Sequence, residues 1–315
     1  MKLTLPAVLL AGATALGGSL GCSSDTQNGA GPLGGTAGTS AASNLSGGGG
    51  ANAGEGAVTD GVCPEHPTPQ HAQGTLLSLS LQLVMAGKPF VFGQPNALPD
   101  GGSLIPINLR FYISEVKLLS SSGEPLAVDA VTEAGVPEPY GVHFFNAEDA
   151  DSSTLRVLAP PGEYAGLSFA LGLKLACNQQ PPAGLSDPLT DSSQMTWPQT
   201  GGFLFLRYEG RYAAADGAGA SGASSTDQIP SAVHMGGDIT KELVPSVTVS
   251  GALSLPPSGT LEKGLNVVMD EIFKGATSNI DVSDESVGFL ATADAVAGLR
   301  LRHDWSELHV FVLEP

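Results

Sequence analysis

Imidazole and thioether groups are the side chains of this sequence best suited to bind a transition metal such as copper. Of the six histidines, His234 is followed directly by Met235, a second soft donor that an extended strand would turn to its opposite face. His143 lies in the segment VHFF, between apolar residues that are typical of a strand. A buried histidine on such a strand is more often held by a hydrogen bond than by a metal. His234 is therefore the stronger candidate ligand.

The other four histidines are weaker candidates. His66 and His71 lie in a proline-rich stretch beside a glycine-rich segment, where we expect them to be solvated. His303 and His309 flank Trp305 and would share a face on an extended strand. The residues around this tryptophan, DWSE, are more typical of a turn, which would separate the two imidazoles.

Oxygen ligands gather in residues 146–151 (NAEDAD), a set that suits calcium in type. The segment lacks the spacing and the glycine of an EF-hand loop, so a solvated acidic turn is the default interpretation and a calcium site the alternative. The sequence contains no nucleophile elbow, zinc-protease motif, P-loop or C-x-x-C pair. We therefore predict that the protein is not an enzyme.

The first cysteine, Cys22, ends a pattern typical of an exported lipoprotein. Lys2 is followed by an apolar run over residues 3–16 and by the sequence LGC. Residues 1–21 are predicted to be the signal peptide, and Cys22 the lipid-modified residue that anchors the chain to a membrane. An ordinary cleaved signal with a chance cysteine is the alternative. Ser23 is compatible with sorting to the outer membrane, so we expect a periplasmic or surface-exposed outer-membrane lipoprotein.

The two remaining cysteines, Cys63 and Cys177, form an even pair. In an oxidising compartment such a pair is predicted to form a disulfide, with two free thiols as copper ligands as the alternative. Residues 22–61, between the signal peptide and this pair, are rich in glycine and contain no aromatic residue, lysine or arginine, and are predicted to be a flexible tether. The net charge of −18 argues against nucleic acid as a partner.

Alternating apolar residues recur along the rest of the chain. Residues 77–83 and 105–113 alternate strictly. The alternation resumes out of phase at Val116 and Leu118, which predicts a β-bulge near Ser114 and Glu115. Further strands are predicted at 167–175, 203–206, 247–255, 267–273 and 308–313, and one helix near 290–301. The fold class predicted for residues 62–315 is therefore a single all-β domain, a β-sandwich of mostly antiparallel strands with a short C-terminal helix and long loops.

Five segments, in this order, resemble the MbnP-like copper-binding family. They are GKPFVFG (87–93), LRFYISEVKL (109–118), PGEYAGLSFALG (161–172), MTW (195–197) with GGFLFLR (201–207), and VHMG (233–236). Together they span about residues 75–275. The resemblance implies an extracytoplasmic β-rich protein that holds one copper ion between two histidines and an oxidised tryptophan, with a dihaem peroxidase as the partner that oxidises the tryptophan.

On this resemblance His234 and Trp197 are predicted members of the copper site, with Met235 beside them. The chain departs from the family where an Asn-His pair is usual, because Asn178 is followed here by Gln179. An amide oxygen is a poor ligand for Cu(I), so a second imidazole must come from elsewhere, and His143 is the predicted donor. The leading hypothesis is a copper-scavenging or copper-storage lipoprotein. The alternative is a metal-free structural or interaction module at the cell surface.

Overall fold

The computed structural model describes residues 63–71, 73–98, 102–196, 202–213, 229–236, 244, 246–272 and 310–314. The predicted signal peptide, Cys22, the tether, Trp197, His303, His309 and the helix near 290–301 lie outside these residues. All described residues belong to one compact unit, Ala57–Pro315. No helix among them is long and apolar enough to span a membrane.

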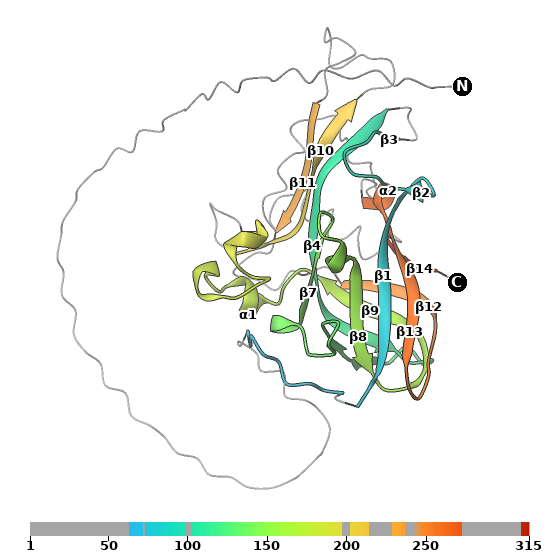
Figure 1. The fold of residues 1–315 in the computed structure, drawn as a ribbon. Coiled ribbons are helices and arrows are strands. Elements are labelled where there is room, and N and C mark those ends of the chain that lie inside the picture. Colours follow the sequence, from blue (N-terminus) through green and yellow to red (C-terminus); the bar gives the residue numbers. More distant parts are fainter. Residues whose placement is uncertain are drawn as a thin grey trace, which may run out of the picture. The chain divides into compact units, whose positions relative to one another are not determined.

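Two β-sheets make up the described fold, which confirms the predicted all-β sandwich (Figure 1). The six-stranded sheet has the order β14-β13-β1-β8-β6, and β2 pairs with β1 at its side. Its strands are β1 (Thr75–Met85), β2 (Lys88–Pro89), β6 (Asp129–Ala130), β8 (Thr154–Ala159), β13 (Thr260–Val268) and β14 (Phe311–Leu313). The pairing of β1 with β13 is parallel, and the other pairings of this sheet are antiparallel.

The eight-stranded sheet has the order β11-β10-β4-β9-β12, with three short strands pairing with β4. The five main strands are β11 (Ile229–Gly236), β10 (Leu204–Ala213), β4 (Ser103–Leu119), β9 (Gly162–Leu171) and β12 (Ser246–Leu255). The short strands are β3 (Asn96–Ala97), β5 (Pro125–Ala127) and β7 (Val142–Asn146). The central strand β4 therefore pairs directly with most of the other strands of this sheet.

The core lies between the two sheets and follows from strict alternation. Leu77, Leu79 and Leu81 of β1 are buried, while the serines between them face outward. From the other sheet, the rings of Phe111 and Phe169 both pack edge-on against Phe311 of β14, with centroids 6.1 and 5.0 Å apart. The face of β4 that carries Phe111 is therefore part of the inner face of the eight-stranded sheet.

The predicted bulge in β4 is confirmed. The register between β4 and β9 shifts between Ser114 and Lys117, and Glu115 adopts a φ of 52°. Two predicted strand ends are wrong. The strand β9 ends at Leu171, and Leu175 begins the helix α1 (Leu175–Asn178). The strand β13 ends at Val268, where the helix α2 (Met269–Ile272) begins.

Candidate functional site

A polar row crosses the outer face of the eight-stranded sheet. In the strand registers His234 of β11 lies opposite Arg207 of β10, Arg207 lies opposite Arg110 of β4, and Arg110 lies opposite Asn146 of β7. Residues directly opposite each other point to the same face of a sheet. Because Phe111, the neighbour of Arg110, faces the core, these four side chains face outward.

The chain between β9 and β10 covers this outer face with α1 and two short 3-10 helices, η3 (Pro182–Gly184) and η4 (Asp191–Ser193). The hydroxyl of Tyr112 donates to the carbonyl of Pro188 at 3.0 Å. Arg110 Nη1 donates to the carbonyl of Ser193 at 3.0 Å, and Arg207 Nη1 donates to that of Gln194 at 2.8 Å. The two arginines therefore hold the covering chain immediately before Met195.

Both arginines are also paired with carboxylates. Arg110, which is 7% exposed, contacts Glu148 at 2.7 Å, and its Nε donates to Asn146 at 3.2 Å. Arg207 donates to both carboxylate oxygens of Glu209, at 2.9 and 3.1 Å from Nη2. Each guanidinium group of the polar row is therefore paired with one carboxylate.

His234 completes this arrangement at the edge of the row. It is 8% exposed, and its Nε2 lies 3.1 Å from Oε1 of Glu209. Burial lowers the pKa of His234 below its ordinary value; Glu209 counteracts this effect and Arg207 reinforces it. The imidazole is therefore neutral near pH 7, the state in which histidine ligates metals.

Asn108 adds a buried amide to the same face. It lies directly opposite Glu209 in the pairing of β4 with β10 and is 7% exposed. Its Oδ1 is buried and has no hydrogen-bond partner in the structure. Buried polar atoms are rarely left unpaired, so this oxygen is a candidate ligand.

The structure does not bring His143 and His234 together, and the predicted pair is wrong in this respect. His143 lies opposite Ile113 of β4, whereas the row of His234 passes through Arg110. These β4 positions are three residues apart, so the two histidines lie on opposite faces of the sheet. His143 is 5% exposed, and its Nε2 donates to the carbonyl of Ser152 at 3.0 Å. Burial lowers the pKa of His143 to about 4, with a smaller contribution from Arg156.

The side chain of Met235 points into the core and away from the face that carries His234. It lies opposite Leu206 and is 1% exposed, as the alternation along β11 requires. The sequence predicted this opposite face, and the structure leaves Met235 with a packing role there. Trp197 lies outside the described residues, although its neighbour Thr196 forms a bridge with Phe203 at the start of β10.

The predicted disulfide is confirmed, because Cys63 and Cys177 are bonded with a Cα–Cα distance of 4.8 Å. This bond removes both thiols as copper ligands. Cys177 belongs to α1, and the next residue, Asn178, accepts a hydrogen bond from the amide of Phe203 at 2.8 Å. The disulfide therefore fixes the part of the covering chain that lies against β10.

The acidic loop uses its oxygens within the fold. Asn146 and Glu148 both bind Arg110, and the carboxylate of Asp149 accepts from the amide of Asp151 at the start of η2 (Ala150–Ser153). In the part of the chain that the structure describes, no group of three or more histidine, cysteine, aspartate or glutamate side chains could by itself hold a metal ion. The calcium alternative gains no support from these contacts.

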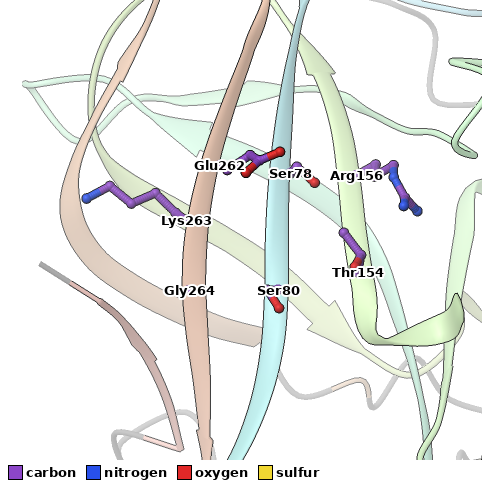
Figure 2. Close-up of a pocket in the computed structure, with 7 residues that line it drawn as sticks. All are labelled: Ser78, Ser80, Thr154, Arg156, Glu262, Lys263 and Gly264. Carbon is purple, nitrogen blue, oxygen red and sulfur yellow. The ribbon is translucent and has the colours of Figure 1, made fainter. Parts of the chain in front are cut away.

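A hollow of about 440 Å³ lies elsewhere, on the outer face of the six-stranded sheet. Figure 2 shows its lining, which comes from β1, β8 and β13: Ser78, Ser80, Thr154, Arg156, Glu262, Lys263 and Gly264. These residues are exposed or half-buried, and none of the predicted site residues is among them. The hollow is hydrophilic and open, and nothing in its lining selects a ligand.

The chain belongs to the MbnP family, whose sequence profile matches residues 74–291. This match confirms the resemblance that the five segments indicated. A solved structure, MbnP from Methylosinus trichosporium, is 20% identical to this chain; the alignment covers 72% of this chain and 87% of that chain, with a TM-score of 0.45. No curated protein matches the chain.

Proposed function

We propose that this protein is an outer-membrane lipoprotein that binds copper, for scavenging or storage, at the polar row through His234. The position of His234 is the observation that carries the proposal. It belongs to the VHMG segment, which resembles the histidine motif of the family. Its imidazole is neutral and largely buried, and it lies beside a carboxylate on the covered outer face.

The described donors of this face fit copper in type. His234 supplies an imidazole nitrogen, Glu209 a carboxylate, and Asn108 an amide oxygen without a partner. Nitrogen and oxygen donors of this kind bind first-row divalent ions, among which copper binds most tightly. Copper would be the cargo of this protein, and the protein's own residues would hold it and shield it from water.

Copper titration of the purified full-length protein, followed by metal analysis after gel filtration, tests this proposal. We expect one copper ion per chain. His234→Ala should abolish it, because the imidazole is the only strong nitrogen donor of the described row. The control is His66→Ala, which removes an exposed imidazole and should leave the stoichiometry unchanged. A His234→Ala protein that still binds one copper with unchanged affinity would contradict the proposal.

The second candidate function is a metal-free structural or interaction module. Two observations favour it: Gln179 stands where the family usually has a histidine, and the carboxylates of the polar row are already paired with arginines. The sole role of such a polar network would then be to fix the covering chain on the sheet. A wild-type protein that binds no copper in the same titration would make this function the better one.

Membrane attachment through Cys22 is part of the proposal and rests on the sequence pattern. Cys22→Ala should move the protein from the membrane fraction to the soluble fraction, or stall its processing, because the lipid is the proposed anchor. A variant that stays with the membrane like the wild type would contradict lipidation at this residue. A dihaem peroxidase is the proposed partner, on family resemblance, and nucleic acid is not expected as a partner.

A further inference from the structure

Asn108 lies on the same face as the polar row, and its buried Oδ1 has no hydrogen-bond partner. The fold itself does not explain why this oxygen is unpaired. Leaving a buried carbonyl oxygen without a partner is unfavourable, because its lost hydrogen bonds to water are not replaced. Asn108 lies in the middle of the outer face, opposite Glu209, with its side chain 7% exposed. Side chains directly opposite each other in an antiparallel pair have Cβ atoms about 5 Å apart, so the amide and the carboxylate are neighbours.

Glu209 is therefore flanked on both sides by groups that can donate to a cation. On one side lies Asn108, and on the other lies His234, whose Nε2 is 3.1 Å from Oε1 of Glu209. A separation of 3.1 Å is close to that of two neighbouring ligands in a square-planar or octahedral site with metal–ligand distances of about 2.1 Å. A cation on Nε2 would replace the hydrogen of the present contact and leave the carboxylate in place.

The geometry points to a mixed nitrogen and oxygen site in which Glu209 and Asn108, rather than a second imidazole, complete the ligand set of His234. This inference rests on the proposed copper function and names the oxidation state that the site selects. Carboxylate and amide oxygens are hard donors, and together with one imidazole they favour Cu(II) over Cu(I). His143 is not needed, which agrees with its place on the inner face of the sheet.

Arg207 sets the orientation of this carboxylate. Its Nε and Nη2 both donate to Glu209, and its Nη1 donates to the carbonyl of Gln194. The guanidinium opposes a nearby cation by its charge, but it also holds the carboxylate beside His234. The net charge of −18 of the whole chain favours cation entry in general.

Titration of the purified full-length protein with Cu(II), and separately with Cu(I) under anaerobic conditions, tests the inference. We expect Glu209→Gln to lower the Cu(II) affinity by at least about tenfold, because the anionic ligand of the proposed site is lost. The matched control is Glu148→Gln, which removes the carboxylate of the neighbouring ion pair on the same face and should change the affinity by less than about twofold.

Asn108→Leu separates a ligand from a structural amide. It should lower the Cu(II) affinity while the melting temperature stays equal or rises, since the unpaired buried oxygen is removed. The electron paramagnetic resonance spectrum of the wild-type protein should show a tetragonal Cu(II) site with one coordinated imidazole nitrogen.

The possible outcomes separate the mixed ligand set from the copper function itself. Copper binding that needs His234 but is unchanged by Glu209→Gln overturns the mixed site and leaves the copper function. Two imidazole nitrogens in the spectrum, or tighter binding of Cu(I) than of Cu(II), overturn the mixed site in the same way. A wild-type protein that binds neither ion removes both proposals.

Discussion

The two buried histidines among the described residues differ in their charged neighbours, although burial lowers the pKa of both. His234 has a carboxylate within 3.1 Å, whereas His143 has only the carbonyl of Ser152 and lies within reach of the positive charge of Arg156. The pKa of His143 falls to about 4, chiefly because burial disfavours the charged imidazole, and Arg156 lowers it further. An imidazole that cannot be protonated in the fold becomes a source of acid sensitivity.

The free energy of unfolding should decrease as the pH falls from about 6.5 to about 4, because of His143. In this window the unfolded chain binds a proton that the folded protein excludes, so acid favours unfolding. The contribution of this residue amounts to roughly 2–3 kcal/mol between pH 7.5 and 4.5. Urea unfolding of the wild type and of His143→Gln at both pH values measures it. An equal decrease in the two proteins would contradict the assignment, and His66→Gln is the exposed control.

Register explains why the sequence predicts the strands but misplaces the site. Alternation within a segment is local, so the outward serines of β1 and the bulge at Ser114 in β4 can be predicted from neighbours along the chain. Whether His143 and His234 share a face depends on which residues of β4 each strand pairs with, and this is a non-local property. The helix α1 was missed because Leu175 continues the alternation of Leu171 and Leu173. The helix α2 was missed because its first residue, Met269, continues the alternation of Leu265 and Val267.

The polar row has a weak signal in the sequence. Arg207 and Glu209 alternate with buried residues of β10, and Asn108 and Arg110 do the same in β4, which in an ordinary sandwich indicates a solvated outer face. Only the structure shows that the covering chain contacts both arginines. It also shows that Glu209 contacts His234 of the neighbouring strand. Sequence reasoning therefore named His234 and missed Glu209 and Asn108 beside it.

Close packing explains why residue 172 of the PGEYAGLSFALG segment is a glycine. Its φ is 130°, and a Cβ at this position would collide with the ring of Phe205. Gly172→Ala should therefore lower the free energy of unfolding by roughly 2–4 kcal/mol, measured by urea denaturation. Gly184→Ala, at an exposed position where a Cβ meets nothing within 4 Å, should change it by less than about 0.5 kcal/mol. Equal effects of the two variants would contradict the close packing of β9's end against β10.

At the scale of the whole molecule, the disulfide joins the start of the described chain to the covering chain. The bonded cysteines are 114 residues apart in sequence. Replacing both by alanine should lower the free energy of unfolding by about 4–5 kcal/mol in the chain-entropy model. Unfolding of the double variant, compared with the oxidised wild type, measures this loss. A wild type whose stability is unaffected by a reductant that opens the bond would contradict it.

The proposed copper function connects these scales, because it needs a neutral imidazole, a correct register and a covering chain that is fixed in place. The most direct test of it is a crystal structure of the copper-loaded protein with anomalous diffraction data at the copper edge. The proposal predicts one anomalous peak on the outer face of the eight-stranded sheet, about 2 Å from a ring nitrogen of His234. No copper peak, or a peak bound to other residues with His234 still paired to Glu209, would contradict it.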